Sequence, residues 1–240
     1  MTRAARIEDF LASAGWPGAD HVTLAQDASF RRYERVTRPG ERAVLMDAPP
    51  DREDVRPFMK IARQLAALGF SAPRILAEDV GAGFLLLEDL GDATFSRLMD
   101  RGEDAAPLYM LATDVLVDLH RTPPADAVPP GTQVYTDALL LTEASLLTEW
   151  YLPAVTGQEA DDAAVAAYRD VWAALLPLAR HVPETLVLRD FHVDNLMRID
   201  GRGGTAACGL LDFQDAVEGP VSYDFVSLVE DARRDVDDGL

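Results

Sequence analysis

The sequence changes character at Gly91, and this change limits the folds that the chain can adopt. Before Gly91, apart from a short helical pattern at 5–14, runs of β-branched and apolar residues alternate with turn sequences such as "TRPGER". Within this part, Glu53 to Leu68 keeps the spacing of an amphipathic helix, and Gly69 ends it. The pattern predicts a five-stranded antiparallel sheet with one inserted helix.

After Gly91 the apolar residues follow the period of helices instead. Helical patterns occupy 93–101, 104–121, 136–152, 161–181 and 222–236. A strand pair around "DGRGG" precedes the last of them. We therefore expect an α+β fold of two lobes, a β-rich N-terminal lobe over 1–90 and a mainly helical C-terminal lobe over 91–240. The cleft between such lobes is a common place for a ligand.

The charge of the chain argues against two classes of partner. Its 22 basic and 41 acidic residues give a net charge of −19, whereas nucleic acids and anionic lipids are bound by basic faces. Cys208 is the one cysteine, so no disulfide forms within the chain, which fits the reducing cytoplasm. No apolar run is long enough to span a bilayer. We expect a cytoplasmic monomer that binds neither nucleic acid nor membrane.

The densest group of polar residues lies in "LRDFHVDN", residues 188–195, just before the apolar "LMRI". Burying such groups costs free energy unless they are paired or used. The segment also holds Asn195, the one asparagine of a chain that is rich in Ala, Gly, Pro and Arg. Its presence at this place suggests a function for the segment.

Asp190, Asn195 and Asp212 form the candidate catalytic group. Asp212 ends the apolar run "CGLLDF", and a hairpin through "RIDGRGGTAACGLL" would return the chain so that Asp212 faces Asn195. A carboxylate and an amide oxygen suit Mg²⁺, while a second carboxylate can take the proton of an acceptor hydroxyl. Phosphoryl transfer needs this combination. Each residue taken alone is equally compatible with an ordinary turn.

Several phrases carry a resemblance to a known family. "LRDFHVDNL" followed by "LLDFQD" resembles the catalytic and metal loops of the aminoglycoside phosphotransferase superfamily, whose members have a protein-kinase-like fold. Further segments, among them "QDASFRRYERV", "GFLLLEDLGD", "LTEWYLPAVTG" and "DFQDAVEGPVSYD", are similar to the bacterial anomeric kinases for N-acetylmuramate and N-acetylglucosamine. The resemblance covers most of the chain and implies ATP and Mg²⁺ as cofactors.

The resemblance also implies a role for each residue of the polar segments. Asp190 would be the catalytic base, and Asn195 and Asp212 would be the Mg²⁺ ligands. His192 is expected to brace the loop through hydrogen bonds. Asp224, in "SYDF", is expected to be a structural anchor or a helix N-cap.

For ATP, the resemblance implies that adenine lies against the linker from Glu88 to Leu90, where backbone groups would contact the base. The phrase "QDASFRRY" lacks the glycines of a kinase phosphate loop. Ser29 is therefore expected to permit close backbone approach, and Arg31 and Arg32 to face the phosphates. The alternative for this arginine pair is an ordinary strand with two exposed side chains.

The chain departs from the general kinase pattern at three places. Met46 stands where kinases carry a lysine on the third strand, and Lys60 is the one lysine of the chain. Gln214 replaces the glycine of the protein-kinase metal loop. The sequence stops at "DVDDGL", where the resembled kinases continue with further helices, so we expect a truncated C-terminal lobe. The substrate-binding residues remain unassigned.

The resemblance, together with Asp190, Asn195 and Asp212, implies an ATP-dependent kinase that phosphorylates the anomeric hydroxyl of N-acetylmuramate or N-acetylglucosamine. The product would be the sugar 1-phosphate, which belongs to peptidoglycan recycling. A first alternative keeps the fold and changes the acceptor to an aminoglycoside or another small alcohol. A second alternative is a nucleotide-binding, catalytically inactive kinase-like module.

Overall fold

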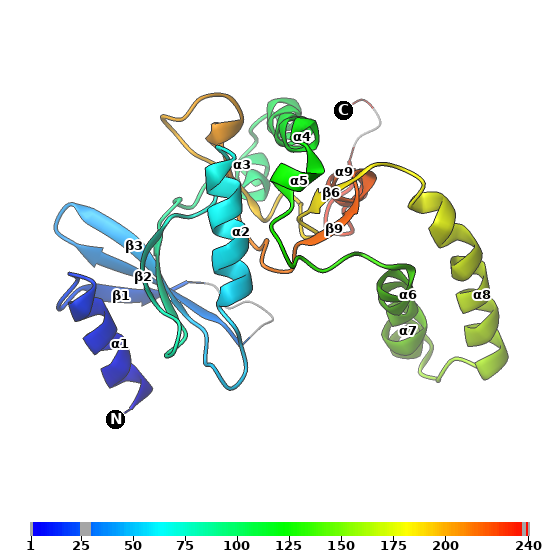
Figure 1. The fold of residues 1–240 in the computed structure, drawn as a ribbon, viewed down its shortest axis with the longest axis horizontal. Coiled ribbons are helices and arrows are strands. Elements are labelled where there is room, and N and C mark those ends of the chain that lie inside the picture. Colours follow the sequence, from blue (N-terminus) through cyan, green and yellow to red (C-terminus); the bar gives the residue numbers. More distant parts are fainter. Residues whose placement is uncertain (1, 25–29, 237–238, 240) are drawn as a thin grey trace.

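The computed structural model describes residues 2–24, 30–236 and 239, and it consists of a sheet followed by a helical part (Figure 1). The sheet is antiparallel throughout, with the strand order β1-β2-β3-β5-β4. Its strands are β1 (Asp20–Thr23), β2 (Arg32–Arg38), β3 (Glu41–Asp47), β4 (Ile75–Asp79) and β5 (Phe84–Glu88). The predicted five-stranded antiparallel sheet is confirmed, including the turn at "TRPGER".

Helices cover both faces of this sheet. Successive residues of a strand point to opposite faces, so Phe84 of β5 lies in the core shared with α1 (Arg3–Ser13) and Leu85 in the core shared with α2 (Arg56–Ala67). Because both faces are buried, the sequence "FLLL" of β5 shows no polar alternation. Helix α2 is the inserted helix that the spacing of 53–68 predicts.

The C-terminal part is mainly helical. Its helices are α3 (Phe95–Asp100), α4 (Ala105–Arg121), α5 (Pro124–Ala127), α6 (Asp137–Leu146), the π-helical turn η1 (Leu147–Tyr151), α7 (Leu152–Thr156), α8 (Asp162–Ala179) and α9 (Ser222–Val229). The helix expected at 136–152 is therefore three elements with a π-helical turn in the middle. The last helix ends at Val229 rather than near 236, because Glu230 leaves the helical conformation with φ −111° and ψ 38°.

Two small antiparallel sheets complete this part. Strands β7 (Leu196–Arg198) and β8 (Cys208–Leu210) form the expected hairpin, whose loop holds the short 3-10 helix η2 (Gly204–Ala207). Strand β6 (Glu184–Val187) pairs with β9 (Val217–Pro220). The sequence "VEGP" of β9 did not predict a strand, since Gly and Pro are uncommon in paired strands.

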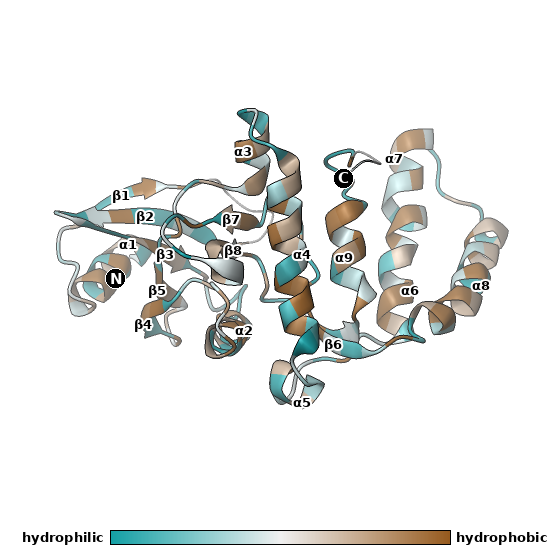
Figure 2. Cartoon of the chain, turned by 90° about the horizontal axis from the view of Figure 1, so that it is seen from above, coloured by the Kyte–Doolittle hydropathy of each residue, from teal (hydrophilic) through white to brown (hydrophobic). Residues whose placement is uncertain are grey.

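Helices α6, η1, α7 and α8 form a hairpin at the end of the molecule opposite to the five-stranded sheet (Figures 1 and 2). Its two arms meet through polar contacts: Arg169 Nη1 donates to Ser145 Oγ and Tyr168 Oη to the carbonyl oxygen of Ala144, both at 2.9 Å. Large apolar side chains on the hairpin are exposed instead: Leu146, Leu147, Trp150, Tyr151, Val155, Val171, Leu175 and Leu178. The hairpin thus contributes little to the main core.

One apolar core joins the sheet to the rest of the C-terminal part. Phe58 of α2 stacks on Phe213, which follows β8, with ring centroids 5.0 Å apart. The sheet ends at Glu88 and the first helix of the next part begins at Phe95, so we propose that the lobe boundary lies near residue 90. In the described part of the chain, no helix combines the length and apolarity that crossing a bilayer requires.

Candidate active site

A cavity of about 460 Å³ lies between the sheet and the β7–β8 hairpin. Its walls come from strands β2, β3 and β5, from the linker 88–92, from the start of α3, and from the loops around Asn195 and Asp212. This volume is in the range of small-molecule sites. The cavity therefore lies where the two-lobe prediction puts a cleft.

The register of the β7–β8 hairpin brings Asn195 and Asp212 to this cavity. Leu196 pairs with Leu210, and the next N–H, that of Leu211, donates to the carbonyl oxygen of Asn195 at 3.0 Å. Asp212 follows directly, so both candidate metal ligands line the cavity from the same end of the hairpin. The hairpin has the arrangement that the sequence "RIDGRGGTAACGLL" suggests.

Asp212 is held in an uncommon backbone conformation. Its φ of +57° is left-handed, a region that non-glycine residues other than Asn and Asp seldom adopt. The amide of Gln214 donates from Nε2 to Oδ1 of the Asp212 carboxylate at 2.5 Å. Gln214, which replaces a kinase glycine, therefore fixes the side chain of Asp212 and leaves Oδ2 for a further ligand.

The amide of Asn195 is oriented by the loop before it. Its Nδ2 donates to the carbonyl oxygen of Asp190 at 3.0 Å and lies 3.2 Å from Nε2 of His192. The imidazole is buried, and burial lowers the pKa of His192, which favours the neutral ring that can accept this hydrogen bond. With Nδ2 engaged on both sides, Oδ1 is the atom of Asn195 that is left for a ligand. The role of His192 as a brace of the loop stays a prediction, and this contact with Asn195 is compatible with it.

Asp190 lies next to these groups, on a partly buried loop. Burial raises the pKa of its carboxyl group, and the nearby charge of Asp212 raises it further. A carboxylate with a raised pKa binds a proton more readily than an exposed one. Asp190, Asn195 and Asp212 thus come together from two separate stretches of the chain.

Asp224 anchors the backbone that leads to Asp190. Its buried carboxylate accepts hydrogen bonds from the N–H of Leu188 at 2.7 Å and of Arg189 at 2.9 Å. Burial raises the pKa of Asp224 to about 7, and the two hydrogen bonds oppose that rise. Asp224 lies in the first turn of α9, whose N-cap residue is Val221. The structure therefore has Asp224 as an anchor rather than as a helix N-cap.

Arg189 connects the same loop to the helical hairpin. Its φ of +71° is left-handed, and its guanidinium forms an ion pair with Glu143 of α6. Glu143 also accepts a hydrogen bond from the hydroxyl of Tyr135, a fully buried residue. A carboxylate on α6 thus holds the residue that precedes Asp190. Nothing in the local sequence indicates this pair, whose members lie 46 residues apart.

The candidate nucleotide residues divide into two groups. Glu88 and Leu90 line the cavity, as the linker prediction requires. Arg31 and Arg32 are not among the residues that line it, and Arg31 Nε lies 3.7 Å from a carboxylate oxygen of Glu53. The part played by these two arginines in ATP binding stays a prediction. Ser29 lies outside the described residues.

The side chain of Glu88 is more engaged than the sequence suggests. Its carboxylate accepts hydrogen bonds from Arg74 Nε at 3.1 Å and from Arg202 Nη2 at 2.6 Å. Arg202 belongs to the loop of the β7–β8 hairpin and also donates to Ser71 Oγ at 2.8 Å. The linker is therefore tied to the hairpin that carries the candidate metal ligands.

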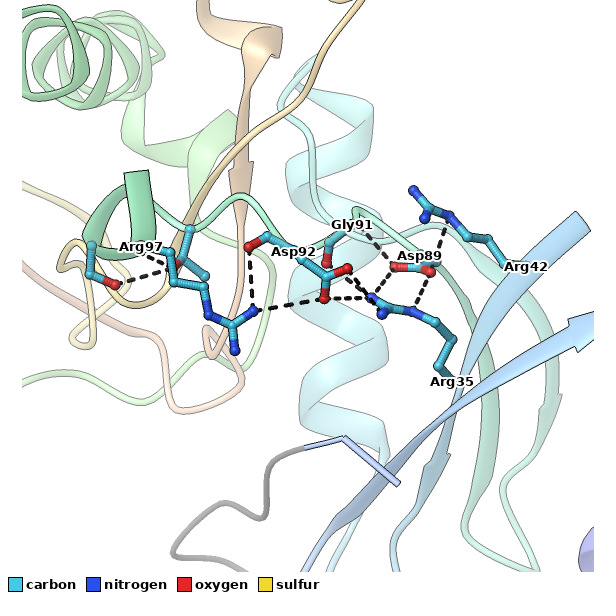
Figure 3. A network of polar contacts seen from close by, with 8 residues as sticks. Arg35, Arg42, Asp89, Gly91, Asp92 and Arg97 are labelled. Atoms are coloured by element: carbon cyan, nitrogen blue, oxygen red, sulfur yellow. Dashed lines mark hydrogen bonds and ion pairs between the residues drawn. The ribbon is translucent and has the colours of Figure 1, made fainter. Parts of the chain in front are cut away.

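A second group of cavity residues is absent from the predicted site. Arg35 of β2 and the linker residues Asp89 and Asp92 line the cavity and bond to one another (Figure 3). Arg35 lies 54 and 57 residues from its two partners. A local sequence motif cannot predict a contact over this separation. The one feature of the sequence that indicated it is the acidic pair Asp89 and Asp92 in "EDLGD".

The donor atoms at Asn195 and Asp212 fit a magnesium ion. An amide oxygen and a carboxylate oxygen are hard ligands, and Mg²⁺ commonly takes few protein ligands, with phosphate and water oxygens completing its coordination. Within the described residues, no three His, Cys, Asp or Glu side chains gather as a metal site. The pair of Asn195 and Asp212 therefore suits an ion that arrives with a nucleotide.

Known proteins match this chain over most of its length. The sequence pattern of the phosphotransferase enzyme family matches residues 20–240. The N-acetylmuramate/N-acetylglucosamine kinase of Pseudomonas aeruginosa is 38% identical over 229 residues, which are 94% of this chain and 65% of that protein. A kinase of the same name from Caulobacter vibrioides is 34% identical, over 98% of this chain and 73% of its own length. The chain thus spans roughly two thirds of the length of these relatives.

A solved structure shares the fold. The gentamicin complex of APH(2")-IIa superposes with a TM-score of 0.67, covering 96% of this chain and 76% of that one at 17% sequence identity. At this identity the similarity concerns the fold alone. It confirms the predicted kinase-like α+β architecture.

Proposed function

The chain belongs to the phosphotransferase enzyme family, and we propose that it transfers the terminal phosphoryl group of ATP to the anomeric hydroxyl of N-acetylmuramate or N-acetylglucosamine. The names of the relatives support this choice of acceptor. The observation that carries the proposal is the convergence of Asp190, Asn195 and Asp212 beside the cavity that Glu88 and Leu90 also line.

Asp190 acts as the general base in this proposal. It accepts the proton of the sugar hydroxyl while the hydroxyl oxygen bonds to phosphorus and ADP leaves. Burial and the charge of Asp212 raise the pKa of Asp190, so the carboxylate holds a proton better than an exposed aspartate. Asp224 keeps the loop in place through the N–H groups of Leu188 and Arg189.

Asn195 and Asp212 would hold a magnesium ion through their free oxygen atoms. Such an ion would supply positive charge to the phosphate oxygens of ATP, where charge develops during transfer. The protein's own contribution is orientation: Gln214 fixes the carboxylate of Asp212, and Asp190 and His192 fix the amide of Asn195. Adenine lies along the linker from Glu88 to Leu90.

We also place the activity in the cytoplasm, in peptidoglycan recycling, and in a monomer. ATP is available in the cytoplasm, and the one cysteine, Cys208, is buried and free. The net charge of −19 supports small-molecule rather than nucleic-acid partners.

The test is detection of a sugar 1-phosphate. The chain is incubated with MgATP and either amino sugar, and the products are separated and examined by ³¹P NMR. The methyl glycoside of N-acetylglucosamine is the matched control, because its anomeric oxygen carries no proton and should receive no phosphate. Transfer to the methyl glycoside, or to a panel of aminoglycosides but to neither amino sugar, would contradict the proposed acceptor.

The same experiment separates the kinase from an inactive nucleotide-binding module. Such a module would be stabilised against heat by MgATP, because a ligand that binds the folded state alone raises its stability. It would yield no phosphorylated sugar at any enzyme concentration. Stabilisation together with transfer supports the kinase.

A further inference from the structure

Arg35 lies at the centre of a network that surrounds the linker (Figure 3). Its Nε and Nη2 donate to the two carboxylate oxygens of Asp89 at 2.7 and 3.1 Å. Nη1 and Nη2 donate to the carboxylate of Asp92 at 3.1 and 3.0 Å, and Nη2 also donates to the carbonyl oxygen of Gly91 at 3.1 Å. One guanidinium on strand β2 thus binds three of the four residues from Asp89 to Asp92.

The network surrounds the buried carboxylate of Asp89. The side chain of Asp89 is 2% exposed, and a carboxylate buried this deeply needs charged partners. Arg42 Nε lies 3.3 Å from Asp89, on the side opposite to Arg35. Asp89 also accepts the N–H of Gly91 at 2.9 Å, while Gly91 has a φ of +94° that glycine adopts without strain. Removing Arg35 would take away most of the hydrogen bonds that hold this turn.

The charges of the network are mutually supporting. The hydrogen bond to Asp89 raises the pKa of Arg35, and the hydrogen bond from Arg35 lowers the pKa of Asp92. Arg97, at the start of α3, adds a second cation at 3.7 Å from Asp92. Arg35 and Asp92 therefore stay charged at neutral pH, and their contact between β2 and the linker persists there.

The linker is fixed on its other side as well. Glu88 is bound by Arg74 and by Arg202, which belongs to the β7–β8 hairpin. Arg35 and the linker residues line the same cavity as Asn195 and Asp212. A shift of the linker would therefore change the cavity wall without touching the residues proposed for catalysis.

We propose that Arg35 is a positioning residue for the nucleotide: it holds residues 89–92 in the shape that receives the base. The inference rests on the proposed function, because it takes the linker as the adenine wall. Arg35 acts through Asp89 and Asp92 and not on the phosphates. Its loss should therefore weaken the contact with the nucleoside and spare the contact with the phosphate chain.

The experiment compares two ligands on the full chain. Competition with MgATP gives the dissociation constants of adenosine, which has no phosphate, and of inorganic tripolyphosphate, which has no base. Arg35→Gln should weaken adenosine binding roughly tenfold, a change of about 1.4 kcal/mol, and leave tripolyphosphate binding unchanged. Arg38→Gln is the matched control on the same strand, since Arg38 pairs with Glu41 and does not line the cavity.

A double-mutant cycle tests the route through the linker. If Arg35 acts through Asp92, the variant Arg35→Gln/Asp92→Asn should bind adenosine no more weakly than Arg35→Gln. Arg35→Lys, which keeps the charge but loses the planar fork, should restore part of the affinity. Hydrogen exchange at the N–H of Gly91 should speed up in Arg35→Gln by more than the change in overall stability accounts for.

The outcomes decide between the inference and its premise. Equal weakening of adenosine and tripolyphosphate, or unchanged adenosine binding together with unchanged exchange at Gly91, would overturn the role of Arg35. A wild-type chain that binds MgATP through its phosphates but has no affinity for adenosine would also overturn it. A wild-type chain that binds no nucleotide would overturn the proposed function itself.

Discussion

The carboxylates on the two sides of the cavity differ in whether arginines pair with them. On the linker wall, the carboxylates of Asp89 and Asp92 are matched by arginines from β2, β3 and α3. On the catalytic wall, formed by the loops that hold Asn195 and Asp212, the carboxylates of Asp212 and of the neighbouring Asp190 have no ion-pair partner within the described residues, whereas Asp194 lies 3.9 Å from Arg233. The proposed base and the proposed metal ligand thus lack the opposing charge that Asp89 and Asp92 receive from arginines.

This difference in pairing suits the linker wall to nucleotide binding and the catalytic wall to phosphoryl transfer. A wall whose charges are already paired keeps its shape before a ligand arrives, which lowers the cost of binding. A wall whose carboxylates lack cations presents unused negative charge, which suits a metal ion and a transferable proton. The predictions below test this contrast, beginning with the largest expected effect.

On the catalytic wall, Asp190→Asn should lower kcat by about a thousandfold, since general-base catalysis contributes roughly 10² to 10⁴ in rate. The affinity for MgATP should stay within about twofold, because the amide keeps the size of the side chain and Asp190 is not proposed to bind the nucleotide. Steady-state kinetics with N-acetylmuramate and calorimetric titration of MgATP measure the two quantities. Normal turnover in this variant would remove Asp190 from the mechanism.

On the linker wall, the largest loss should be in stability. Asp89→Asn leaves the partly buried Arg35 without its closest carboxylate, and breaking a buried ion pair costs about 3 kcal/mol. Urea unfolding gives the free energy of unfolding. The matched control is Asp51→Asn, whose side chain is 79% exposed and should change stability by less than about 0.5 kcal/mol. Equal effects for both variants would mean that the linker network does not stabilise the fold.

Behind the catalytic wall, Asp224 gives a pH effect of defined sign. Because its pKa in the folded state is about 7, above the ordinary value of 3.8, the folded state holds the proton more tightly than the unfolded state does. Its contribution to stability is full below pH 4 and is lost as the pH rises through 7, and the part lost between pH 5 and pH 7.5 is about 2.5 kcal/mol. Asp224→Asn should flatten this slope, which urea unfolding at pH 5 and pH 7.5 measures. Parallel slopes in both proteins would contradict the raised pKa.

The smallest expected effect concerns the metal loop. Gln214→Ala removes the hydrogen bond to Asp212, and a hydrogen bond to a charged group contributes about 1.5 kcal/mol. The KM for MgATP should rise about tenfold, and excess Mg²⁺ should recover part of the loss. Gln64→Ala is the control, since Gln64 donates to the carbonyl oxygen of Asp126 in another part of the molecule. An unchanged KM would show that Asp212 needs no such support.

Local patterns in the sequence predicted most of the fold. The apolar spacing of 53–68 predicts a helix and "TRPGER" predicts a turn, and each depends on residues that are close in the sequence. The structure has the helix and the turn at these positions. Helix α9 and strand β9 fit less well, because their ends depend on packing against distant segments. The π-helical turn within 136–152 has no signal that its apolar spacing could reveal.

The candidate site divides in the same way. Asn195 directly precedes the first strand of one hairpin and Asp212 follows its second strand, so the sequence between them indicated that they meet. The contact of Arg35 with Asp89 and Asp92 joins a strand to a linker more than fifty residues away. Such contacts depend on the tertiary fold, so neither the composition nor the spacing of residues along the chain predicts them.

The ion pair between Glu143 and Arg189 has a mechanical consequence. The helical hairpin of α6, η1, α7 and α8 has few buried apolar side chains, and segments of this kind are displaced at low free-energy cost. Because Arg189 directly precedes Asp190, a displacement of α6 would be transmitted through this ion pair to the loop that carries the proposed base.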